Sequence, residues 1–152
     1  MHESIFITEI KIWNREDLHS DYLSNYQIFI GDNADYSKNT LCKNGNAFSD
    51  SQNITCDLQG RYITIRLMGT NYLQLCEVEA YSTPNYSLPE IGSTNLAYRT
   101  YTDQYEITND GESQRAVDGN YSQVWTDSSC TYSAYATNAW WSTDLFQVVN
   151  VT

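Results

Sequence analysis

The sequence predicts an all-β fold, most simply a β-sandwich, and three observations lead to this class. Four segments alternate apolar and polar residues with the period of two that is typical of half-buried strands; they cover residues 5–13, 26–32, 61–68 and 73–81. The stretches between them, such as GDNADYSKN and KNGNAFSDSQN, are rich in turn-forming Gly, Asn, Asp and Ser. No long segment has a helical period, and only brief helical turns are expected around SQRAVDGN.

Each predicted strand is supported by its own residues. In IFITEIKIW (5–13), YQIFIGD (26–32) and RYITIRLM (61–68), isoleucines occur in pairs two positions apart. LQLCEVEAY (73–81) follows the same alternation with leucine, cysteine and valine. Later, the segment NAWWSTDL fits either the core and a strand entry or a sugar platform, and we expect Trp141 in the core.

Length and composition indicate one folded domain. The chain has 152 residues, 41% hydrophobic and only 18% charged, which is too apolar for a disordered protein. The net charge of −11, with only eight Lys and Arg, argues against nucleic acid as a partner, because phosphate binding needs clustered cations. An acidic surface fits a calcium-binding extracellular domain as well as simple solubility, so charge does not decide between them.

Cysteines and glycosylation motifs favour an oxidising compartment. The chain has four cysteines without a CxxC pair, and four sequons at Asn53, Asn85, Asn120 and Asn150. No apolar run is long enough to span a membrane, and the opening MHESIFITEI lacks the features of a signal peptide. We therefore expect an extracellular or cell-surface location, as a piece of a longer secreted protein.

When the two halves are exchanged, the chain resembles a known family. The segments NLA, AVDGN, SCT, WW followed by DL, NR followed by D, GRY and LCEVE then occur in the order of the F-type lectin (fucolectin) family, a branch of the discoidin-like, galactose-binding jelly rolls. The resemblance implies one jelly-roll domain in permuted order. Residues 1–82 would be the family's second half, residues 83–92 a linker, and residues 93–152 the first half.

The origin of this order has two explanations, a circular permutation or a cut from a tandem array. The segments SIFIT (4–8) and VVNVT (148–152) align with the same family strand, which favours the tandem origin. We expect the domain to close within one chain, because chain termini usually lie at the surface and close together. A domain-swapped dimer is the alternative.

The resemblance also implies how the cysteines pair. Four cysteines permit three pairings, and the family pattern selects Cys76 with Cys130 and Cys42 with Cys56. Four buried free thiols are the alternative.

A structural calcium ion is the cofactor that the resemblance implies. The turn in RAVDGN brings Asp118 and Asn120 together, and calcium prefers six to eight oxygen ligands. Family positions that bind calcium correspond here to the carbonyls of Arg115 and Cys76 and the side chains of Asp118, Asn120, Ser129 and Glu77. Calcium binding would leave the Asn120 sequon unused. Zinc is not expected, because there are two histidines and no suitable cysteine spacing.

The sugar motif of the family is only partly present. Arg15 and Asp17 match it, but Tyr132 and Tyr22 stand where the family has a histidine and a second basic residue. Leu18 and His19 replace the adjacent cysteines that lie under the sugar in many relatives. The alternative role for Arg15 and Asp17 is an ion pair that fixes a loop.

Two functions follow as expectations. The first is a calcium-stabilised carbohydrate-binding module, with fucose-type glycans as possible ligands. The second is a repeat of a larger surface protein that binds proteins or is purely structural. An enzyme is not expected, because the sequence has no GxSxG, HExxH or phosphate-binding glycine loop.

Overall fold

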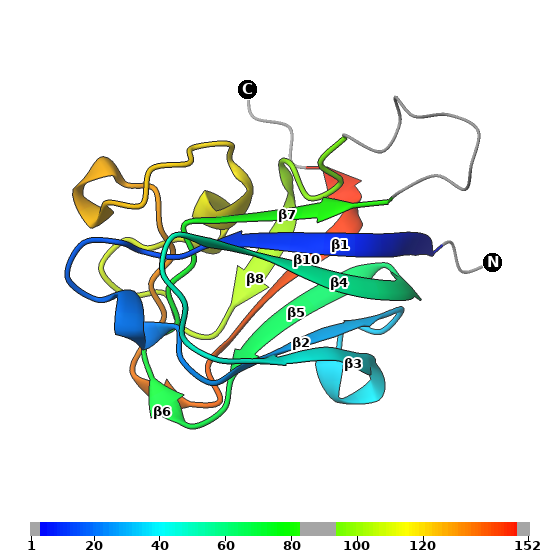
Figure 1. Cartoon of the computed structure of the whole chain (residues 1–152), viewed down its shortest axis with the longest axis horizontal. Helices are drawn as coiled ribbons and strands as arrows, with labels where there is room; N and C mark the ends of the chain where they lie inside the picture. The colour runs from blue at the N-terminus through cyan, green and yellow to red at the C-terminus, as the bar shows by residue number, and fades with distance from the viewer. Residues whose placement is uncertain (1–3, 83–93, 149–152) are drawn as a thin grey trace.

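The computed structural model describes residues 4–82 and 94–148, which form an antiparallel β-sandwich (Figure 1). This confirms the predicted all-β class. One sheet has the strand order β4 (Ser51–Gly60), β1 (Ile5–Trp13), β7 (Glu77–Tyr81). The other has the order β3 (Thr40–Gly45), β2 (Tyr26–Gly31), β5 (Tyr62–Leu67), β10 (Trp140–Val148), β8 (Thr100–Gln104).

Short elements lie between these strands. β6 (Thr70–Asn71) pairs with β9 (Ala136–Thr137) at one end of the sandwich. The described helical elements are all 3-10 turns: η1 (Ser20–Tyr22), η2 (Tyr36–Lys38), η4 (Ser113–Val117) and η5 (Trp125–Asp127). Among residues 4–82 and 94–148, no helix is long and apolar enough to cross a membrane.

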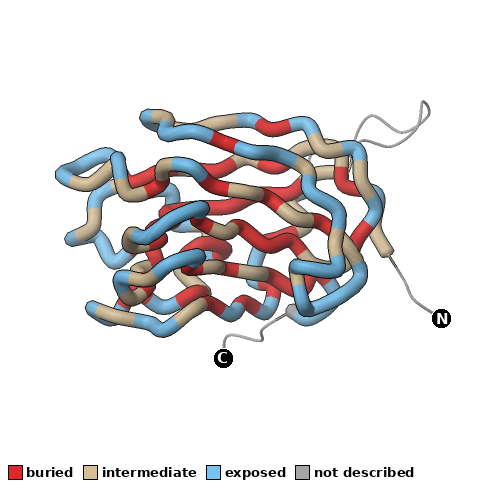
Figure 2. Tube along the Cα trace, turned by 90° about the horizontal axis from the view of Figure 1, so that it is seen from below, coloured by how far each residue is buried: buried red, intermediate tan, exposed pale blue. Residues whose placement is uncertain are grey.

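The core lies between the two sheets, where the alternating isoleucines meet (Figure 2). Ile10 and Ile12 of β1 and Ile63 and Ile65 of β5 are fully buried. Burying each such side chain contributes about 1.5 to 3 kcal/mol. Trp141 is also fully buried, as expected, and its indole Nε1 donates to the carbonyl of Ser113 at 3.0 Å.

The two halves of the chain share one sheet. β10, from the second half, lies between β5 and β8, and Trp141 pairs with Ile65 across strands. The predicted linker 83–92, the sequons at Asn85 and Asn150, and residues 149–152 of the repeated segment lie outside the described residues. The permuted order itself stays a prediction.

The strand predicted at 73–81 is shorter than expected. Only β7, Glu77–Tyr81, pairs as a strand. Before it, the backbone N–H groups of Leu73 and Leu75 donate to the hydroxyls of Ser133 and Thr131, at 2.8 and 2.9 Å. These side chains take the place of a neighbouring strand, which the alternating pattern cannot reveal.

Strand β4 was not among the predicted strands, and its start lies in a stretch assigned to loop. It forms the edge of its sheet, and its side chains are mostly exposed or half-buried, with Ile54 buried among them. An edge strand with one solvent-exposed face has a weak apolar pattern in the sequence.

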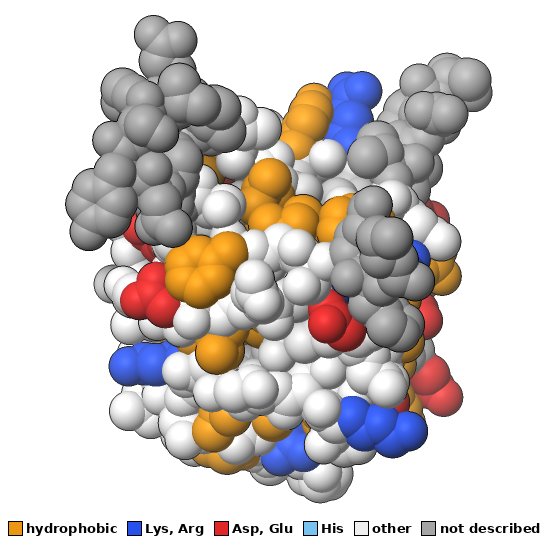
Figure 3. Space-filling view, turned by 90° about the vertical axis from the view of Figure 1, so that its right-hand side faces the viewer, with side chains coloured by type: hydrophobic (Ala, Val, Ile, Leu, Met, Phe, Trp, Pro, Cys, Tyr) orange, Lys and Arg blue, Asp and Glu red, His pale blue; other side chains and the backbone are white. Residues whose placement is uncertain are grey.

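On the face shown in Figure 3, positive and negative side chains are scattered among polar ones rather than gathered into a patch.

Candidate functional site

The structure has two disulfides, and both match the predicted pairing. Cys76 is bonded to Cys130 and Cys42 to Cys56, with sequence separations of 54 and 14. By the chain-entropy model the longer link stabilises by about 4 kcal/mol and the shorter by about 3. The Cys76–Cys130 bond joins the two halves of the chain, and it places Glu77 and Ser129 at the same end of the fold.

Arg15 and Asp17 form a partly buried ion pair in the loop after β1. The Arg15 side chain is 7% exposed and that of Asp17 24%. Arg15 donates from Nε and Nη2 to the two carboxylate oxygens of Asp17, and from Nη1 to Oε1 of Gln74 at 3.3 Å. The Arg15 hydrogen bond is the main cause that lowers the pKa of Asp17. The pair is therefore charged at neutral pH.

The loop that carries this pair is fixed by Asn14, which is fully buried. Its side-chain Nδ2 donates to the carbonyls of Ser20 and Phe48, both at 2.8 Å. Its Oδ1 accepts from the backbone N–H of Arg15 at 2.8 Å. Arg15 thus leaves the strand in a defined direction. Asn14 belongs to the motif NR followed by D, but this role for its side chain was not predicted.

An aromatic cluster surrounds the ion pair, and it contains the other three predicted sugar-site residues. His19 stacks on Tyr22 at 4.5 Å between ring centroids, Tyr22 lies 5.2 Å from Tyr72, and Tyr72 lies 5.2 Å from Tyr132. Tyr132 meets Trp125 edge to face at 5.1 Å. The aromatic cluster consists of His19, Tyr22, Tyr72, Trp125, Tyr132 and Tyr135.

The structure thus brings all five predicted sugar-site residues together, and it adds Tyr72, Trp125 and Gln74. The guanidinium of Arg15 lies 5.5 Å from the centroid of the Trp125 ring. Gln74 is fully buried, and its Nε2 has no hydrogen-bond partner among the described residues. The family pattern did not point to these three side chains, although aromatic residues in loops were a visible signal.

Glu77, from the predicted calcium set, is buried without a partner. It is 0% exposed, and neither carboxyl oxygen accepts a hydrogen bond within the described part of the chain. Burial, reinforced by the nearby Asp118 carboxylate, raises the pKa of Glu77 to about 9. The backbone N–H of Gly119 offsets this in part without reaching hydrogen-bond geometry. A carboxyl group in this position is suited to a cation.

Asp118 and Asn120 lie in the turn that faces Glu77. Burial raises the pKa of Asp118, and its Oδ1 accepts the backbone N–H of Asn120 at 2.9 Å. Gly119 between them has a φ of +82°, a conformation that side chains rarely adopt. The turn therefore holds both oxygen-bearing side chains at one place.

The remaining predicted calcium ligands lie on neighbouring backbone. Ser129 is fully buried and its hydroxyl donates to the carbonyl of Val124 at 3.1 Å, which leaves its oxygen lone pairs for another partner. Arg115 lies in the last turn of η4, and its Nη1 donates to the carbonyl of Cys130 at 3.3 Å. Within residues 4–82 and 94–148, no three or more His, Cys, Asp or Glu side chains are grouped so that they could hold a metal ion by themselves, and the predicted set has only two carboxylates.

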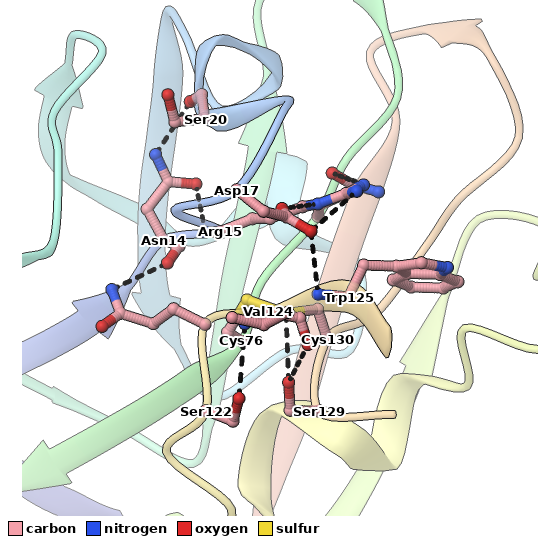
Figure 4. Close-up of polar contacts among 12 residues, drawn as sticks. Asn14, Arg15, Asp17, Ser20, Cys76, Ser122, Val124, Trp125, Ser129 and Cys130 are labelled. Atoms are coloured by element: carbon pink, nitrogen blue, oxygen red, sulfur yellow. Dashed lines mark hydrogen bonds and ion pairs between the residues drawn. A yellow bond between two sulfur atoms is a disulfide. The ribbon is translucent and has the colours of Figure 1, made fainter. Parts of the chain in front are cut away.

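Residues 122–130, the bridging segment, connect the two regions (Figure 4). At one end, Ser122 donates its N–H to Oδ1 of Asn120 at 3.1 Å. In the middle, Trp125 donates its N–H to Asp17 at 3.1 Å. The Trp125 ring lies 5.5 Å from the guanidinium of Arg15 and also 5.5 Å from that of Arg115. Order in the bridging segment therefore affects both the ion pair and the predicted cation ligands.

Comparison with known proteins gives one structural match. No protein-family model matches the chain, and no curated protein matches it. Among solved structures, the chain is similar to the crystal structure of an F-lectin (fucolectin) from the serum of Morone saxatilis, the striped bass. The two are 30% identical, the match covers 91% of this chain and 48% of that chain, and the TM-score is 0.48. This chain spans about half the length of that fucolectin, a member of the family that the motifs resemble.

Proposed function

We propose that the chain is a calcium-stabilised carbohydrate-binding module of a secreted or surface protein. The observation that carries the proposal is the Arg15–Asp17 pair, held within the aromatic cluster. Aromatic rings pack against the apolar face of a sugar, while a fixed guanidinium and carboxylate bind its hydroxyls. The family resemblance and the match to a fucolectin support the same class of ligand.

Fucose-type glycans are the ligands that the resemblance favours, but the residues of the site differ from the family pattern. Tyr132 and Tyr22 supply hydroxyls and ring faces where two basic groups would bind the sugar. Each lost charge-assisted hydrogen bond removes about 1.5 to 3 kcal/mol. Affinity for a single sugar should therefore be weak, and useful binding would depend on several modules acting together.

The calcium ion of the proposal would be bound at the Glu77 end of the site. Glu77, Asp118, Asn120 and Ser129 would supply side-chain oxygens, and Arg115 and Cys76 would supply carbonyls. The unpaired, buried carboxyl group of Glu77 supports this assignment, because a bound cation would offset the cost of burying its charge. The ion would stabilise the bridging segment rather than take part in a reaction.

A glycan array in calcium tests the carbohydrate function. Wild type should bind a limited set of glycans, and both Arg15→Ala and Trp125→Ala should lose that binding. Phe6→Ala is the matched control, because Phe6 is 43% exposed and lies near the start of β1, whereas Arg15 follows the end of that strand. Binding that survives in folded Arg15→Ala and Trp125→Ala would place the glycan elsewhere.

Thermal melting tests the ion. At a calcium concentration a hundredfold above Kd, binding should stabilise the fold by about 2.7 kcal/mol. Chelation should lower the melting temperature, and Asp118→Ala should abolish the calcium response. Equal melting temperatures in calcium and in chelator would remove calcium from the proposal.

A structural or protein-binding repeat is the second candidate. It is favoured by the number of Arg15 donors that already bond Asp17 and Gln74, and by the 7% exposure of the Arg15 side chain. Under this alternative, Arg15→Ala would lower stability, and wild type would bind no glycan on the array. The two readouts together separate the candidates.

A further inference from the structure

A second candidate binding site lies on the outer face of the five-stranded sheet. Along β5, Ile63 and Ile65 point into the core, so Thr64 and Arg66 belong to the opposite face. A cavity of about 220 Å³ opens there, between η2 and the sheet, and it shares no residue with the aromatic cluster. Its lining residues are Ala34, Asp35, Tyr36, Thr64 and Trp140.

The polar groups around this cavity are buried but unpaired. Thr64 is only 1% exposed although it lies on the outer face, and its hydroxyl has no hydrogen-bond partner within residues 4–82 and 94–148. Two further buried atoms, Nε of Arg66 and Oε1 of Gln27, also have no hydrogen-bond partner in this described part of the chain. Gln27 and Trp140 are the cross-strand neighbours of Arg66, so these groups occupy adjacent positions.

Burial without a hydrogen bond carries a cost. Each unsatisfied polar group destabilises the folded state by about 1 to 3 kcal/mol. The patch thus has three unpaired groups: the Thr64 hydroxyl, the Nε–H donor of Arg66 and the Oε1 acceptor of Gln27. A ligand with several hydroxyls could supply hydrogen-bond partners for such groups. A valine in place of Thr64 would fill the same space without this cost.

Aromatic rings form the walls of the cavity. Trp140 and Tyr36 line it, and Tyr36 packs against Phe29 at 5.3 Å between centroids. The guanidinium of Arg66 lies 5.5 Å from the Tyr36 ring, and its Nη1 donates to the Tyr36 hydroxyl at 3.5 Å. Tyr36 and Arg66 thus hold each other at the edge of the cavity.

Charge and size restrict the ligand. Asp35 is anionic and Arg66 is cationic, so the patch has no excess of either charge. The cavity is smaller than the roughly 300 Å³ at which pockets for drug-sized molecules begin. Ring faces with unpaired hydrogen-bonding groups suit a small, neutral, polyhydroxylated molecule.

We propose that the cavity between η2 and the five-stranded sheet binds a single neutral sugar ring, with the Thr64 hydroxyl as a hydrogen-bonding group and Trp140 as the stacking surface. This is a site separate from the proposed glycan site at Arg15. It requires neither calcium nor the bridging segment.

Nuclear magnetic resonance of the full chain tests the proposal, with D-glucose, D-galactose, D-mannose and L-fucose as probes. The indole N–H of Trp140, assigned with Trp140→Phe, should shift with at least one probe, while that of buried Trp141 stays in place. The shift should persist in Arg15→Ala and in chelator, even if those conditions abolish binding at Arg15. No shift of the Trp140 indole N–H with any of the four sugars, or an equal shift of the Trp141 indole N–H, would overturn the proposal.

Thr64→Val distinguishes a binding site from a patch of unsatisfied polar groups that binds no ligand. Removing the unpaired hydroxyl should leave the melting temperature of the free protein unchanged or higher, and it should weaken sugar binding by about threefold to tenfold. Ser142→Ala is a matched control, because Ser142 is the cross-strand neighbour of Thr64 and does not line the cavity. Unchanged sugar affinity in Thr64→Val would contradict the assigned role of the hydroxyl.

Discussion

Two carboxylates near the bridging segment, Asp17 and Glu77, lie in opposite electrostatic environments. The Asp17 carboxylate is paired with Arg15 and also accepts the Trp125 N–H. Glu77 is more deeply buried, and neither of its oxygens accepts a hydrogen bond in the described structure. Burying a carboxylate charge costs free energy unless a partner offsets it. The protein supplies that partner for Asp17, whereas for Glu77 it would have to come from outside.

This difference explains the opposite pKa shifts. Hydrogen bonding to Arg15 lowers the pKa of Asp17, whereas burial raises the pKa of Glu77 to about 9. The Asp17 carboxylate already has a cationic partner, whereas the Glu77 carboxyl group has none and would be stabilised in its charged form by a bound cation. The predictions below test this contrast, beginning with the largest expected effect.

Glu77→Gln should have opposite effects on stability with and without calcium. Because the folded-state pKa is raised, the contribution of Glu77 to stability is greatest below its unfolded value of 4.5 and declines as pH rises toward 9. At pH 8 in chelator, the variant should be more stable than wild type by about 3 kcal/mol. In calcium it should be less stable, because an ion ligand is lost.

Urea unfolding at several pH values, with and without calcium, measures this reversal. Glu9→Gln is a control for removing a carboxylate from a strand of the same sheet. The same sign of effect in both conditions would show that Glu77 does not bind the ion.

Asp17→Asn should destabilise the fold by about 2 kcal/mol. The buried Arg15 would lose its charged partner, which costs up to about 3 to 5 kcal/mol when a pair is fully buried, and less here because the Asp17 side chain is 24% exposed. Denaturant unfolding measures the loss. Asp21→Asn, on the nearby turn η1, should change stability by less than about 0.5 kcal/mol. Equal effects of the two variants would mean that the pair contributes nothing.

The double variant Tyr132→His/Tyr22→Arg should raise fucose affinity by more than about tenfold, or 1.4 kcal/mol. It returns two basic groups to positions within the aromatic cluster, near Arg15. Titration calorimetry in calcium measures the gain, and Tyr101→His serves as a control at an exposed position on β8. A folded double variant that binds no fucose would argue against the aromatic cluster as a sugar site.

Much of the fold could be predicted because it depends on local alternation. The spacing of the isoleucines in β1 and β5 predicted which face of each strand is buried. The resemblance to F-type lectins predicted both cysteine pairs. The segment 73–76 could not be read in this way, because Ser133 and Thr131 bond its backbone from far along the chain. Strand β4 was missed because an edge strand carries few buried side chains.

The candidate site was predictable only where a motif named its residues. Arg15, Asp17, Tyr22 and Tyr132 do come together, as do Glu77 and Asp118. Tyr72 and Gln74 enter through the tertiary fold and have no motif of their own. The lack of a hydrogen-bond partner for Glu77 is also a property of the packed structure, which no sequence pattern specifies.

Under the proposed function, the Arg15 region and the Glu77 region, joined by the bridging segment, form one calcium-stabilised carbohydrate site. Titration calorimetry tests this most directly, with the glycan that binds most strongly on the array, first in calcium and then in chelator. Below the melting temperature of the chelated protein, removal of calcium should weaken glycan binding by at least about tenfold, or 1.4 kcal/mol. Asp118→Ala should give the same weak binding in both conditions. Equal glycan affinity with and without calcium, in a protein shown to have lost the ion, would contradict a calcium-stabilised carbohydrate site.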